Sequence, residues 1–119
     1  MENLLFSKSH EWVKIDGNKA KVGLSDYAQH ELGDIVYVNL PEVGAKVEVE
    51  TAFTDVESVK AVSEVISPVS GTITAVNDEL EGAPEMINNA PYDAWIIEVE
   101  LTDKGELMTE EQYKEFCKQ

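Results

Sequence analysis

The chain has 119 residues, 43% of them apolar, and its 9 lysines, absent arginine and 24 carboxylates give a formal net charge of −15. This length favours one domain, residues 1–119, around a modest core. Nucleic-acid binding and attachment to anionic membranes are excluded function classes, because both need a cationic surface. One cysteine forms no internal disulfide, and the lack of a long apolar stretch or a basic leader predicts a cytoplasmic protein.

Apolar and polar residues alternate with a period of two along most of the sequence, which predicts a mainly β protein. Residues 10–24 are expected to form a hairpin that turns at Asp16-Gly17-Asn18, because glycine tolerates the positive φ of tight turns. Residues 67–71 are expected to form a turn. Further strands are predicted at residues 35–40, a buried strand, and at 47–49, 53–59, 62–66, 72–76 and 95–101.

Two short helices interrupt the β pattern. Ser25 is placed to cap the first helix and Gly33 to end it. Residues 109–112, Thr-Glu-Glu-Gln, match a capping box for a C-terminal helix that should pack across the end of the barrel. Residues 77–93 have no period and are expected to form a long loop that holds Met86-Ile87 against the body.

Groups of residues that would support catalysis or metal binding are not apparent in the sequence. His10 and His30 are 20 residues apart and Cys117 has no second cysteine, so packed or surface roles are favoured over metal ligation. The glycine-rich phosphate and dinucleotide motifs are absent. A serine nucleophile with a distant histidine partner stays open, but no catalytic or metal site is predicted.

The segment from Asp55 to Glu64 joins two β-prone stretches without glycine, asparagine or proline, and Lys60 stands at its midpoint. A tight turn at residues 58–61 would project Lys60 into water, and an ordinary solvated lysine is the alternative. A Schiff-base lysine must be neutral near pH 7, whereas Glu57 and Glu64 favour its charged form. These carboxylates fit better with an exposed amine that a separate enzyme acylates.

The run Glu57-Ser58-Val59-Lys60-Ala61, followed by Ser67-Pro68-Val69-Ser70-Gly71, resembles the lipoylation segment of the H protein of the glycine cleavage system. Further matches cover nearly the whole chain. They include Ser9-His10-Glu11-Trp12, residues 23–29, 32–38 and 40–44, and Ile87-Asn88 with Pro91-Tyr92. The resemblance implies a mainly β, lipoyl/biotinyl-type barrel-sandwich hybrid of two small antiparallel sheets with two short helices, the second of them C-terminal.

This resemblance implies a carrier that is not itself an enzyme and that holds lipoic acid as an amide on Lys60. The carrier would take the aminomethyl intermediate of glycine from glycine decarboxylase, the P protein, to aminomethyltransferase, the T protein. It would then pass reducing equivalents to dihydrolipoyl dehydrogenase, the L protein. A tethered arm keeps the reacting sulfur at high effective concentration. A monomer is expected, modified by a lipoylating enzyme.

The resemblance also assigns roles to residues around the arm. It implies that the lipoylating enzyme recognises Glu57, Glu64 and Gly71, and that Ser9 and Glu11 line the cleft where the loaded arm rests. Each role has a simpler alternative. Glu57 and Glu64 would only make the hairpin soluble, Gly71 would only make a turn, and Glu11 would face solvent.

Other carriers share parts of this pattern. An H-like protein that accepts or relays lipoyl or octanoyl groups in lipoate metabolism or a redox circuit would have every motif above. A biotin carrier would place its lysine between methionines, where this chain has Val59 and Ala61. A lipoyl domain of a 2-oxo-acid dehydrogenase would have an Asp-Lys-Ala motif, and a hydrolase would need a catalytic constellation.

Overall fold

The computed structural model describes residues 4–118, so residues 1–3 of the predicted leaderless N-terminus and residue 119 lie outside the described part. The described residues form these strands: β1 (Leu4–Phe6), β2 (Glu11–Asp16), β3 (Lys19–Leu24), β4 (Ile35–Val38), β5 (Lys46–Val47), β6 (Ala52–Ser58), β7 (Val62–Ile66), β8 (Val69–Val76) and β9 (Ile97–Lys104). The helices are α1 (Asp26–Leu32), α2 (Glu79–Gly82), α3 (Met86–Asn89) and α4 (Glu110–Cys117).

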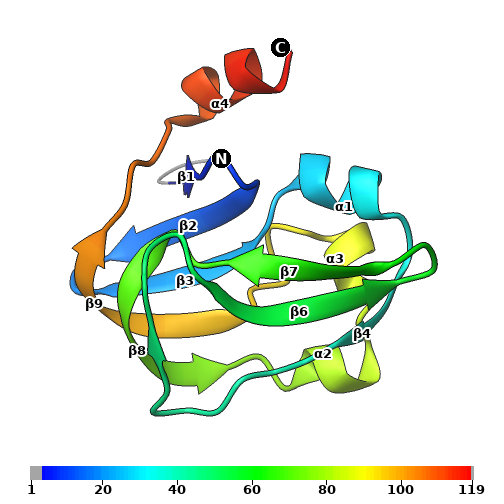
Figure 1. Ribbon diagram of the computed structural model, residues 1–119, viewed down its shortest axis with the longest axis horizontal. Coiled ribbons are helices and arrows are strands. Elements are labelled where there is room, and N and C mark those ends of the chain that lie inside the picture. The colour runs from blue at the N-terminus through cyan, green and yellow to red at the C-terminus, as the bar shows by residue number, and fades with distance from the viewer. Residues whose placement is uncertain (1–3, 119) are drawn as a thin grey trace.

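The strands form two antiparallel sheets, as predicted. One sheet has the order β1-β2-β3-β9-β8-β5 and the other the order β4-β6-β7. In Figure 1, the β6–β7 hairpin, drawn in green, extends to a tip on the α1 side of the molecule. The β pattern of the sequence follows from this arrangement, because each strand turns alternate side chains toward the core. The core includes Val13, Ala20, Val22, Val38, Val56, Val65, Ile73, Ile97 and Val99.

The predicted hairpin at residues 10–24 is present as β2 and β3, paired from Glu11 opposite Leu24 to Asp16 opposite Lys19. Gly17 lies in the turn with a φ of 63°. A residue with a Cβ atom rarely adopts this φ, so the glycine sets where the two strands turn.

The predicted β pattern needs correction in several places. The predicted buried strand at 35–40 ends at Val38, and a register shift between Ile35 and Tyr37 leaves Val36 and Tyr37 53% and 48% exposed. The predicted turn at 67–71 is shorter, because β8 already begins at Val69. The strand β1 was not predicted, since three residues are too few to show an alternation.

The helix α1 begins and ends where the sequence predicts. The Ser25 hydroxyl accepts the Ala28 N–H at 3.1 Å, and Gly33 follows the helix with a φ of 80°. The expected long loop at residues 77–93 is wrong in part, because it contains the one-turn helices α2 and α3. A single turn is too short to show a helical period. Ile87 is fully buried, as expected.

The helix α4 has the predicted capping box, in which the Thr109 hydroxyl accepts the Gln112 N–H at 3.3 Å. It packs against β1, where the Tyr113 ring stacks on Phe6 with the ring centroids 4.4 Å apart. The Tyr113 hydroxyl also lies 2.7 Å from the Ser25 hydroxyl, which ties α4 to the start of α1. No helix within residues 4–118 is long and apolar enough to cross a membrane.

Candidate functional site

The turn between β6 and β7 is built by one serine. The Ser58 N–H donates to the Ala61 carbonyl at 2.9 Å. The Ser58 hydroxyl accepts the N–H groups of Lys60 and Ala61 at 3.2 Å each and donates to the Ala61 carbonyl at 3.1 Å. A serine side chain can replace a backbone partner in this way, so the turn forms without glycine, asparagine or proline.

The tip of this hairpin rests on the segment that follows α1. The Val59 N–H donates to the Asp34 carbonyl at 3.0 Å, and the Lys60 Nζ lies 3.4 Å from the Glu31 carbonyl oxygen. A Cβ atom added to Gly33 would lie 3.3 Å from the Lys60 Cε, so the lysine stem runs close over the glycine backbone. Lys60 is therefore an exposed primary amine on a tip that is supported from below.

The two predicted recognition carboxylates lie on the outer face of the hairpin. Glu57 is half-buried and sits between Tyr37 and Val62, its cross-strand neighbours, which are both exposed. Val56, the residue before Glu57 on β6, is buried on the inner face. Glu64 follows Val62 by two residues, so it shares the outer face with Glu57. The structure thus brings Glu57, Glu64 and Lys60 together on one hairpin.

Gly71 lies elsewhere, in the six-stranded sheet. It is inside β8, between Val47 of β5 and Leu101 of β9. A Cβ atom at this position would come within 2.1 Å of the Glu100 carbonyl oxygen and 2.9 Å of the Val99 Cγ1. Close packing alone accounts for a glycine here, and the alternative that Gly71 makes a turn is wrong. Its role in lipoylation stays a prediction.

Glu11 is buried at the start of β2, with 1% of its surface exposed, so the alternative of a solvent-facing glutamate is wrong. Its Oε1 accepts the Ser7 hydroxyl at 2.7 Å and also the Ser9 hydroxyl. Burial raises the pKa of the carboxyl to about 7, although hydrogen bonds from Ser9, Ser7 and the Ile66 backbone favour the ionised form. The Glu11 carboxyl therefore keeps its proton to a higher pH than a solvent-exposed glutamate does.

Ser7 was not identified from the sequence. It is buried, and its hydroxyl also accepts the Glu11 N–H at 3.0 Å. Ser7 and Ser9 lie in the turn between β1 and β2, so no strand alternation in the sequence indicates that both hydroxyls meet the Glu11 carboxyl.

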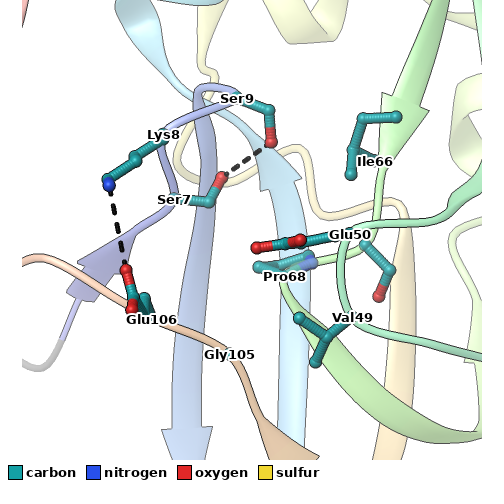
Figure 2. A pocket seen from close by; sticks show the side chains of 10 residues that line it. Ser7, Lys8, Ser9, Val49, Glu50, Ile66, Pro68, Gly105 and Glu106 are labelled. Atoms are coloured by element: carbon teal, nitrogen blue, oxygen red, sulfur yellow. Dashed lines mark hydrogen bonds and ion pairs between the residues drawn. The ribbon is translucent and has the colours of Figure 1, made fainter.

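An open cavity of about 320 Å³ lies beside this group. Ser9 lines it, as expected, whereas Glu11 does not line it and contacts the lining residues Ser7 and Ser9 from behind. Figure 2 shows the Ser7 and Ser9 hydroxyl groups and the Glu50 carboxylate turned toward the same space, with Ile66 on the β7 side. β7 leads from the Lys60 turn to Ile66, and its five residues span about 17 Å at about 3.3 Å per strand residue. One strand therefore connects the lysine tip with the polar cavity.

Each histidine lies beside one polar side chain. The Nδ1 atom of His10 lies 2.7 Å from the Tyr113 hydroxyl, and the exposed His30 lies 3.5 Å from Asp26. Cys117 is half-buried on α4. Within residues 4–118, no group of three or more His, Cys, Asp and Glu side chains is arranged to hold a metal ion.

Known proteins share this sequence and this fold. The family model for the glycine cleavage H-protein matches residues 4–119. The "Glycine cleavage system H protein" of Alkaliphilus oremlandii is 53% identical over 96% of this chain and 92% of its own length. The protein of the same description from Bacillus pumilus is 52% identical over 99% and 96%.

The match extends to a solved structure. The crystal structure of a glycine cleavage system H protein from Mycobacterium marinum superimposes with a TM-score of 0.93 at 35% identity, covering 100% of this chain and 99% of that one. The lipoyl-type fold expected from the resemblance is confirmed by this agreement. The chain therefore belongs to the glycine cleavage H-protein family.

Proposed function

We propose that this chain is a lipoyl carrier of the glycine cleavage system and that Lys60 is its attachment point. It shuttles the aminomethyl unit of glycine from the P protein to the T protein and reducing equivalents to the L protein, without catalysing a step itself. The observation that carries the proposal is the exposed amine of Lys60 on the supported hairpin tip. A single domain over residues 1–119, a monomeric state and a cytoplasmic location remain predictions.

The residues at the tip fit a covalent lipoyl amide. Lys60 offers a primary amine, and its neighbours Val59, Ala61 and Val62 are exposed as well, so an acylating enzyme can approach from outside. The lipoyl group, when attached, supplies sulfur chemistry that carries a one-carbon unit and two electrons. The protein's own contribution is a firm base for a long arm, because the hydrogen bonds of Ser58 and Val59 fix the turn.

The polar cavity fits the proposed resting place of the loaded arm. Ser9 is exposed while Glu11 lies behind it, so a cationic group that entered the cavity would meet a hydroxyl backed by a carboxyl. A nearby cation favours the ionised form of the Glu11 carboxyl, and the two opposite charges then attract each other.

The proposed function is tested by mass and by activity. Protein isolated from its native cell should carry the mass of one lipoyl group, which intact-mass measurement separates from octanoyl and biotinyl groups. The lipoylated protein should then support glycine decarboxylation by the P protein. A lipoylated protein that the P protein does not use would favour the H-like relay instead.

We expect Glu57→Ala to slow lipoylation several-fold while the free energy of unfolding stays within about ±0.5 kcal/mol of the parent. The reason is that Glu57 lies on the outer hairpin face and is only half-buried. Timed intact-mass measurements with the lipoylating enzyme check the rate. Glu48→Ala removes an exposed carboxylate outside the hairpin and serves as the control. Equal rates for all three proteins would make Glu57 a solvating residue only.

A further inference from the structure

The side chain of Asn88, on α3, binds the segment between α1 and β4, which lies more than 50 positions earlier in the sequence. Its Oδ1 accepts the Ile35 N–H at 2.8 Å. Its Nδ2 donates to the Gly33 carbonyl at 2.9 Å and to the Gln29 Oε1 at 3.0 Å. One half-buried amide therefore clamps the end of α1 to the start of β4 through three hydrogen bonds.

The clamped segment is the one on which the lysine tip rests. Asp34 lies between the two backbone groups that Asn88 binds, and its carbonyl accepts the Val59 N–H at 3.0 Å. Gly33, under the Lys60 stem, has a φ of 80° and no side chain of its own to fix it. The position of this support therefore depends on contacts from outside the segment.

We infer that Asn88 is a positioning residue for acylation of Lys60, because it holds the Gly33–Ile35 segment that supports the hairpin tip. The inference rests on the proposed function, since it concerns the same lysine. Without the clamp, the tip has several poses, and the lipoylating enzyme binds only the competent one. A lower competent fraction raises the apparent dissociation constant in inverse proportion and leaves the rate at saturation unchanged.

The chain offers controls that separate positioning from general stability. Ile87 precedes Asn88 and is fully buried in the core, so Ile87→Val weakens the fold and leaves the clamp in place. Asn89 follows on the same helix and is exposed, so Asn89→Ala removes an amide that is not part of the clamp.

The experiment measures lipoylation kinetics with a lipoate–protein ligase, lipoate and ATP, with the unmodified carrier as the varied substrate. We expect Asn88→Ala to raise the KM for the carrier about fivefold, as for a competent fraction of about one fifth, with kcat within about twofold of the parent. Ile87→Val and Asn89→Ala should keep the parent's KM. Hydrogen exchange of the Val59 amide in the unmodified protein should be faster in Asn88→Ala than in either control.

A second variant covers the case in which Asn88→Ala does not fold. Asn88→Asp keeps an acceptor for the Ile35 N–H but loses the donors to Gly33 and Gln29, and it should raise the KM and the Val59 exchange rate in the same way. An unchanged KM in a folded Asn88 variant, or an equal rise in Ile87→Val, would overturn the inference. A parent that is not acylated at Lys60 would overturn the proposed function instead, and Val59 exchange would then decide whether Asn88 positions the tip.

Discussion

Lys60→Arg is expected to fold as the parent does and to lose lipoylation completely. Arginine keeps the positive charge and a long apolar stem, so the exposed position should change the free energy of unfolding by no more than about 0.5 kcal/mol. The guanidinium stays protonated and offers no primary amine for acylation. Charge is therefore retained while the chemistry is removed, which makes the loss specific to the amine.

Intact mass after incubation with the lipoylating enzyme measures this result, and thermal unfolding checks the fold. Lys46→Arg, at an exposed position on β5, is the matched control and should be acylated like the parent. Lipoyl mass that persists in Lys60→Arg would show that another of the nine lysines is the acceptor. The same result would remove the hairpin from the proposed site.

Local features of the sequence predicted much of the fold because their causes are local. The turn at Gly17 depends on one backbone angle, and the capping box at Thr109 on residues three apart. The hairpin tip was predicted from the spacing around Lys60, and Ser58 explains how a turn forms there without glycine. The residues in each of these contacts lie within a few positions of one another, so the local sequence is enough to predict the contact.

Features that depend on distant contacts were not predictable in this way. Asn88 binds the Ile35 N–H across 53 positions, and nothing near Asn88 in the sequence indicates that partner. The tight packing of Gly71 against the Glu100 carbonyl, on a strand far along the chain, is likewise not indicated by its neighbours in the sequence. Val36 is exposed because the pairing of β4 with β6 shifts register between Ile35 and Tyr37. The apolar run at residues 35–38 gives no sign of this shift.

The free energy of unfolding is expected to depend on pH through the buried carboxyl of Glu11. Its pKa is raised from 4.5 to about 7 because the carboxyl is buried. An unfolded glutamate ionises at the lower value, so between the two values the folded state holds one more proton. The stability that this proton contributes is present below about pH 4.5 and is lost as the pH rises through about 7.

We expect Glu11→Gln to remove this loss, because glutamine has a similar shape and no charge to desolvate. Relative to the parent, the free energy of unfolding of the variant should rise by about 2.5 kcal/mol between about pH 5 and about pH 8.5. Denaturant unfolding at a series of pH values measures the difference. All other titrating groups are common to both proteins, so the difference isolates Glu11.

Glu64→Gln is the matched control, because it makes the same change at an exposed carboxylate on β7 and is measured over the same pH series. Parallel curves for Glu11→Gln would show that the buried carboxyl holds no extra proton in the folded state. A steep difference would show that the protein keeps an ionisable group where a neutral one is more stable, which is the trade-off expected of a functional residue. Glu11 would then be poised to give up its proton when a cation enters the cavity beside Ser9.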